Sequence, residues 1–151
     1  MDVLRRNTDY ALRAMLNLTK HYGDEPISTR ILADEEQIPY QLGCKLMQRL
    51  HDAKLVKSCM GPKGGFRLGR QPLKINLLEV IEVMQGAIRL NRCLLGLEVC
   101  ERRKSCVISS KLAELQEKIR GYLAGVTLDK LAQSRAIKIK QITKRSRRKR
   151  Q

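Results

Sequence analysis

The sequence has very few aromatic residues and no long apolar run. Only 3% of its 151 residues are Phe, Trp or Tyr, and Trp is absent. Binding single-stranded nucleic acid by base stacking requires aromatic platforms, so the composition argues against that class of protein. No run is long enough to span a bilayer, and the N-terminus opens with charges in place of a signal peptide. We therefore expect a cytoplasmic protein without a transmembrane segment.

The sequence also lacks the signals of an enzyme. The glycine-rich segment at residues 61–65 is not followed by the Lys-Ser/Thr pair of a phosphate-binding loop. His21 and His51 have no convincing nucleophile partner. We therefore expect a protein that is not an enzyme.

Positive charge dominates the residues that are present. The formal net charge is +16, so a polyanion is the expected partner. Residues 135–151 contain nine Lys or Arg and no acidic residue, which leaves +7 on the rest of the chain. Such a basic tail is expected to be disordered. It either adds phosphate contacts or is simply solvated.

Helical patterns fill the first part of the chain. A first helix is expected from near Asn7, as its N-cap, to about His21. Ser28 can cap a short second helix with Ile31 and Leu32 facing inward. These two helices would precede a third.

The third helix is the expected reader of DNA bases. Pro39 fits its first turn. Proline has no backbone N–H, and an N–H in the first turn of a helix would have no helical partner. The apolar pattern leaves one face outward, and Gln, Lys and Arg side chains on such a face can reach base edges and phosphates. An ordinary solvated face is the alternative. The outward residues are Tyr40, Gln41, Lys45, Gln48 and Arg49.

A basic hairpin is predicted directly after this helix. Val56 and Phe66 lie in short strand-like runs on either side of the segment GPKGG. Lys63 and Arg67 decorate it, and such a wing normally contacts the DNA backbone or minor groove. The pattern predicts a mainly α winged helix-turn-helix with a small two-stranded wing. A purely structural hairpin is the alternative.

The second part of the chain predicts a dimerisation helix. Asn76 and Glu79 resemble a capping box that opens a helix ending at Gly86. A long helix is expected from about Val107 to Ala124, with one apolar stripe that must pack on something. We expect it to cross a second copy in a two-fold dimer, although packing within its own chain is the alternative. Thr127 is expected to cap a final short helix through Leu131.

Three cysteines lie between these two helices. Cys93, Cys100 and Cys106 are separated by six and five residues, which is too open for the usual zinc knuckle and unlike common ferredoxin spacings. Neighbouring Arg and Lys residues favour thiolates, which bind soft metals and are also reactive. A metal centre, a disulfide and a zinc site remain open. Cys44 and Cys59 are expected to be packing residues.

Taken together, these features resemble the Rrf family of bacterial winged-helix transcriptional regulators, with its IscR-like and NsrR-like iron–sulfur sensors. The resemblance covers roughly residues 1–133 and excludes the basic tail. It is carried by the opening segment NTDYALRAM, the wing GPKGGFRLG after LVKS, the helix INLLEVIEVMQG and the three cysteines.

The resemblance implies a homodimer that binds an iron–sulfur cluster through Cys93, Cys100 and Cys106. In the IscR type a His lies three residues after the last Cys, but here that position is Ser109. The nitric-oxide-sensing type uses an Asp near the N-terminus, so Asp9 of the partner subunit is the candidate fourth ligand. This substitution favours [4Fe–4S] over [2Fe–2S]. Asp9 could instead only reinforce the start of the first helix.

The expected organisation has four parts. Residues 1–86 form the DNA-binding domain, 87–106 the cysteine loop, 107–134 the dimerisation region and 135–151 the basic tail. We expect a transcriptional regulator that acts as a repressor. An iron–sulfur cluster that senses nitric oxide, iron or redox state would control its affinity for the operator. The expected DNA contacts are Ser28, Tyr40, Gln41, Lys45, Arg49, Lys63 and Arg67. The alternatives are a cluster-free regulator controlled by thiol oxidation or a partner protein, and a basic RNA-binding protein.

Overall fold

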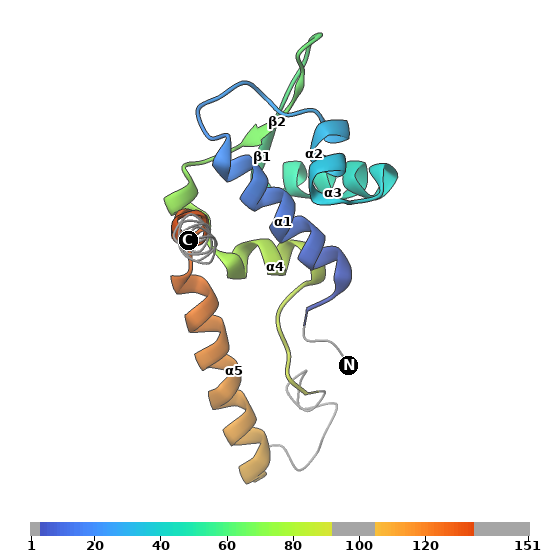
Figure 1. The fold of residues 1–151 in the computed structure, drawn as a ribbon. Helices are drawn as coiled ribbons and strands as arrows, with labels where there is room; N and C mark the ends of the chain where they lie inside the picture. The colour runs from blue at the N-terminus through green and yellow to red at the C-terminus, as the bar shows by residue number, and fades with distance from the viewer. Residues whose placement is uncertain (1–3, 92–104, 135–151) are drawn as a thin grey trace, which may run out of the picture.

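A computed structural model describes residues 4–91 and 105–134. This part of the chain is mainly helical, with one two-stranded antiparallel sheet. In Figure 1, α1 to α4 gather around one core, the β1–β2 hairpin projects from one end, and α5 extends from the other. The elements in chain order are α1 (Arg6–Lys20), α2 (Thr29–Glu36), α3 (Tyr40–Asp52), β1 (Val56–Cys59), β2 (Gly65–Leu68), η1 (Pro72–Lys74), α4 (Leu77–Gln85) and α5 (Val107–Gly125).

The helix starts differ from the sequence expectation at two places. Arg5, not Asn7, is the N-cap of α1, and no side chain caps it. A tertiary contact fixes this start instead, because the Arg5 N–H donates to Gln85 Oε1 at 3.0 Å. Pro39 is the N-cap residue of α3 and lies just before its first turn. The predicted Ser28 cap of α2 is confirmed: Ser28 Oγ accepts from the Ile31 N–H at 3.3 Å.

The core draws buried residues from α1 to α4, both strands and Leu128. Leu32 faces it as predicted, but the prediction for Ile31 is wrong, because Ile31 is 53% exposed. Ala33 takes the inward place beside α3. It approaches Gly43 so closely that a Cβ on Gly43 would lie 3.6 Å from the Ala33 Cβ. Ala33 therefore lies on the inner side of α2, and Ile31 lies on its outer side.

The predicted two-stranded hairpin is present, with β1 antiparallel to β2. Lys57 pairs with Arg67 on one face, and Ser58 pairs with Phe66 on the other. Phe66 also forms a two-way backbone bridge with Ile27, which attaches the wing to the segment before α2. The Gly61 φ of +114° supplies the left-handed backbone conformation that the turn requires.

The second part of the chain also follows the prediction. Asn76 Oδ1 accepts from the Glu79 N–H at 3.0 Å and caps α4, which ends before Gly86. The reciprocal half of the capping box is missing, because the Glu79 carboxylate pairs with Arg70. Thr127 Oγ1 accepts from the Lys130 N–H at 3.5 Å, and residues 128–134 are helical. No helix in the described ranges is long and apolar enough to cross a membrane.

Candidate nucleic-acid interface and metal ligands

The outer face of α3 has the sidedness that the sequence predicts. Tyr40, Gln41, Lys45 and Arg49 are exposed, while the opposite side packs into the core through buried apolar residues: Leu46, Met47 and Leu50. An exposed helix face with long polar and cationic side chains, beside a basic wing, has the form of a helix that enters the major groove.

The structure adds Arg30 to this surface, a residue that the sequence reasoning missed. Its guanidinium lies 5.2 Å from the centroid of the Tyr40 ring, in a cation–π contact. Arg30 is in the first turn of α2, and Tyr40 is the first residue of α3. No linear pattern pairs these residues, because only the turn between the two helices brings them together.

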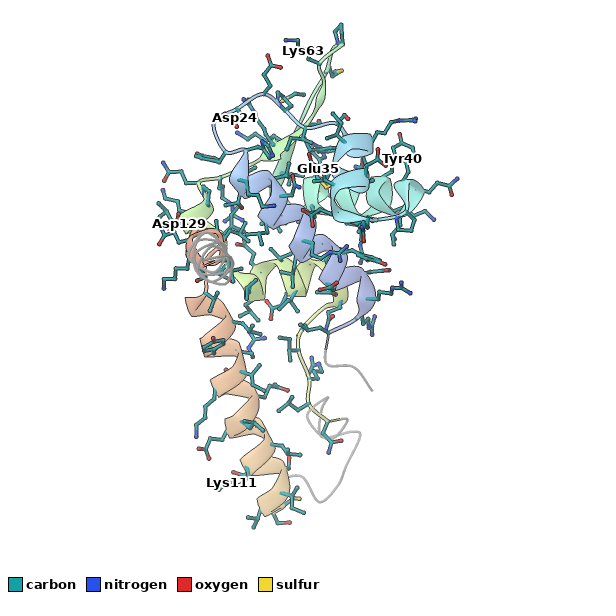
Figure 2. All side chains as sticks on the ribbon, in the orientation of Figure 1. Asp24, Glu35, Tyr40, Lys63, Lys111 and Asp129 are labelled. Carbon is teal, nitrogen blue, oxygen red and sulfur yellow. The ribbon has the colours of Figure 1, made fainter. Side chains whose placement is uncertain are left out.

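The wing presents its predicted cations in two different settings. Lys63 lies at the tip, where its Nζ is 3.1 Å from Glu25 Oε1, and both side chains are exposed (Figure 2). Arg67 lies on the wing face opposite the one that carries Phe66. It lines a cavity of about 320 Å³ together with Lys57, His21 and Arg70. The predicted DNA contact Ser28 holds its hydroxyl oxygen toward the first turn of α2.

Of the three predicted ligands, only Cys106 belongs to the described residues; Cys93 and Cys100 lie outside them. Cys106 is a free, half-buried thiol at the N-cap of α5. Its Sγ accepts from the Ser109 N–H at 3.5 Å. Cys44 and Cys59 are also free and half-buried, consistent with packing roles. Residues 4–91 and 105–134 contain no cluster of three or more His, Cys, Asp or Glu able to hold a metal ion.

Asp9 is exposed in the first turn of α1. Within the described ranges its carboxylate forms no hydrogen bond or ion pair. Figure 1 shows the start of α1 and the start of α5 well apart, so one chain does not bring Asp9 and Cys106 together. A site that uses both residues requires a second chain.

A polar row on α4 connects three parts of the molecule. Glu79 pairs with Arg70 after the wing, and Glu82 pairs with Arg120 on α5. Gln85 Oε1 accepts from the buried Thr8 hydroxyl at 2.7 Å. The three acceptors recur every third residue and so lie along one side of the helix. Through them, α4 contacts the segment after the wing, the long helix and the start of α1.

The comparisons with known proteins agree with this arrangement. A model of the Rrf2 family, described as iron-dependent transcriptional regulator, matches residues 4–134. The HTH-type transcriptional regulator IscR of Xenorhabdus nematophila is 29% identical over 128 residues, which cover 85% of this chain and 77% of the relative. An HTH-type transcriptional regulator of Aquifex aeolicus is 31% identical over 124 residues, covering 81% of this chain and 85% of the relative.

Two solved structures share the fold. CymR, the global cysteine regulator of B. subtilis, has 28% identity and a TM-score of 0.73, with 89% of this chain and 98% of that chain covered. IscR of T. potens has 24% identity and a TM-score of 0.71, with 87% and 86% covered. At 24% identity, the similarity to IscR of T. potens shows only that the two proteins share a fold.

Two short helices, an outward-facing α3 and a basic hairpin define a winged helix-turn-helix protein that binds DNA. With the family match over residues 4–134, the chain belongs to the Rrf2 family of transcriptional regulators. It is a regulator of transcription and not an enzyme.

Proposed function

We propose that this protein is a dimeric transcriptional regulator, mainly a repressor, whose operator affinity is set by an iron–sulfur cluster bound to Cys93, Cys100 and Cys106. The observation that carries this proposal is the state of Cys106. It is a free, half-buried thiol at the junction between the cysteine segment and the long helix. The family description as iron-dependent supports the same chemistry.

The donor set fits such a group. Thiolates are the usual protein ligands of iron–sulfur clusters. The start of α5 favours negative charge at the Cys106 sulfur, toward which the Ser109 N–H is directed. Ser109 is buried and its backbone N–H donates to the capping Cys106 sulfur, so we assign it no ligand role. When bound, the cluster would supply redox chemistry and reactivity toward nitric oxide or oxygen.

The fourth ligand in this proposal is Asp9 of the partner subunit, which favours a [4Fe–4S] cluster over [2Fe–2S]. The exposed, unpaired carboxylate of Asp9 supports this assignment, as does its separation from Cys106 within one chain. A carboxylate is a harder ligand than a thiolate and should dissociate more easily. That bond is the expected point of attack for nitric oxide or an oxidant.

The long helix has the surface that a two-fold dimer requires. Ile108, Leu115 and Tyr122 recur every seven residues and so lie along one line of α5, with 71%, 47% and 73% of each residue exposed. We define these three residues as the apolar line. Elsewhere on α5, hydrogen bonds from Lys118 and Lys111 hold the pKa of Glu114 below its usual range. The apolar line is therefore the expected contact with a second copy.

In such a dimer, two copies of α3 would read half-sites about one DNA turn apart. Tyr40, Gln41, Lys45 and Arg49 would face the bases, and Lys63 would reach the backbone. The α4 polar row would connect the cysteine loop, residues 87–106, to the DNA-binding domain. Gln85 lies just before that segment and is hydrogen-bonded to Thr8 and to the Arg5 N–H, in the helix that carries Asp9.

Substituting one predicted ligand tests the proposal. Cys100→Ala should abolish the visible absorption of anaerobically purified protein and change its operator affinity, while sedimentation still shows a folded dimer. Cys59→Ala is the matched control, because it removes a half-buried thiol from the wing and should leave the absorption intact. Unchanged absorption and unchanged DNA binding in Cys100→Ala would contradict the proposal.

A cluster-free regulator controlled by thiol oxidation or a partner protein is the second candidate. The observation that favours it is the 28% identity to CymR of B. subtilis, the global cysteine regulator of that organism. Protein purified without oxygen in the presence of iron and sulfide distinguishes the two candidates. Colourless protein that contains no sulfide and still binds DNA would select the cluster-free regulator.

A further inference from the structure

Arg30 has an unusual position at the start of α2. Its guanidinium is stacked over the Tyr40 ring, and within the described ranges it has no acidic partner. It also lies in the first turn of a helix, where the macrodipole is positive and a cation is unfavourable. The cation–π contact leaves the positive charge of Arg30 exposed and able to bind an anion.

The fold places Arg30 where DNA phosphates are expected. In a helix-turn-helix, the helix before the recognition helix crosses the DNA backbone, and the first residues of the recognition helix contact base edges. Here α2 is the crossing helix, and Tyr40 begins the recognition helix. Tyr40 lies at the outer end of α3 in Figure 2, and it is 49% exposed.

We propose that Arg30 binds a phosphate of the operator backbone while its stacked guanidinium holds the Tyr40 ring against the bases. Stacking occupies the flat face of a guanidinium and leaves its N–H edge free for bidentate bonding to phosphate. Arg30 thus couples a backbone contact to the position of a base-reading residue. This inference rests on DNA binding alone and is independent of the iron–sulfur proposal.

The chain contains a matched control for this pair. Arg6 lies 5.6 Å from the centroid of the Tyr10 ring, and its Nε donates to the Tyr10 hydroxyl at 3.1 Å. Arg6 is exposed and belongs to α1, outside the α2–α3 unit. Arg6→Ala therefore removes the same charge and the same kind of contact without touching the proposed interface.

The experiment measures binding to a duplex selected by the wild-type protein from a random library, and to the same duplex with scrambled bases. Arg30→Ala should weaken binding to the scrambled duplex by about tenfold, because a charge-assisted phosphate contact carries no sequence information. It should weaken binding to the selected duplex further, because the Tyr40 ring also loses its contact with Arg30. It should also reduce the magnitude of the slope of log K against log salt by about 0.9 for each α2–α3 unit bound to DNA. Arg6→Ala should change neither the affinity nor the slope.

Two further variants separate charge from geometry. Arg30→Lys should keep the salt slope but lose affinity for the selected duplex, because an ammonium cannot stack and fork as a guanidinium does. Tyr40→Phe should retain the salt slope and the Arg30 contact, because it retains the ring. Equal affinities and slopes for Arg30→Ala and Arg6→Ala would overturn the proposal. Full recovery of affinity in Arg30→Lys would overturn its stacking part.

Discussion

At the scale of single residues, Gly65 is the position where the wing depends on the absence of a side chain. A Cβ there would lie 2.2 Å from the Ile27 carbonyl oxygen and 2.7 Å from the Ser28 backbone nitrogen. These are backbone atoms of one neighbouring segment, so no flexible side chain can move aside. The Ile27–Phe66 bridge is therefore possible only with glycine at this position.

We expect Gly65→Ala to lower the free energy of unfolding by about 2 kcal/mol or more, as overpacking against a fixed neighbour does. Urea denaturation followed by circular dichroism measures the loss. DNA affinity should also fall, because the wing detaches from the segment before α2. An unchanged urea midpoint would show that the wing adapts to the added methyl group.

Gly43 is the matched case in which the same change should be favourable. A Cβ on Gly43 would meet Ala33 and Thr29 at 3.6 Å, an ordinary contact distance. Gly43→Ala should raise the free energy of unfolding by about 0.5–1 kcal/mol, because alanine loses less backbone entropy in a helix. A loss of stability in the same urea experiment would mean that α2 and α3 cannot tolerate this contact.

At the scale of elements, α5 keeps several apolar side chains exposed to solvent. Only Ser109 is buried among its 19 residues. The stripe predicted from sequence is half-buried at Leu112, Ile119 and Leu123, while Leu115 faces solvent. The apolar line becomes recognisable only once the structure shows which residues the protomer leaves uncovered.

Leu115→Arg should convert the dimer to a monomer while the helical content remains the same, because a buried unpaired charge on the apolar line disfavours association. Ser110→Arg adds the same charge on another face of α5 and should leave the dimer intact. Sedimentation velocity measures both variants. A dimer that persists in Leu115→Arg would place the contact between subunits elsewhere.

At the scale of the whole molecule, charge is distributed unevenly along the chain. Residues 135–151 contain nine of its 31 basic residues. This segment lies outside the described residues and outside the family match. Any effect of this segment on DNA binding is expected to be electrostatic.

Deleting residues 135–151 should flatten the dependence of DNA affinity on salt if the tail contacts phosphates. Each lost contact should reduce the slope of log K against log salt by about 0.9, because fewer counterions are released. Binding isotherms over a range of salt concentrations measure this slope for the full and shortened chains. Identical slopes would show that the tail takes no part in binding.

Local patterns in the sequence were sufficient for most of the architecture. The Ser28 and Asn76 caps, the sidedness of α3, the glycine-rich hairpin and the extent of α5 each depend on residues close together in the chain. Such features follow from short-range hydrogen bonding and apolar periodicity, both of which are visible in the sequence. The winged helix was predictable for this reason.

Other features were decided by contacts between distant parts of the chain. Gln85 contacts the start of α1 from 80 residues away, and Ala33 rather than Ile31 meets α3 at Gly43. The stacking of Arg30 on Tyr40 likewise depends on how α2 meets α3. The sequence by itself determined the elements and their chemistry. Only the tertiary structure decided which side chains meet, because packing selects among local arrangements of similar energy.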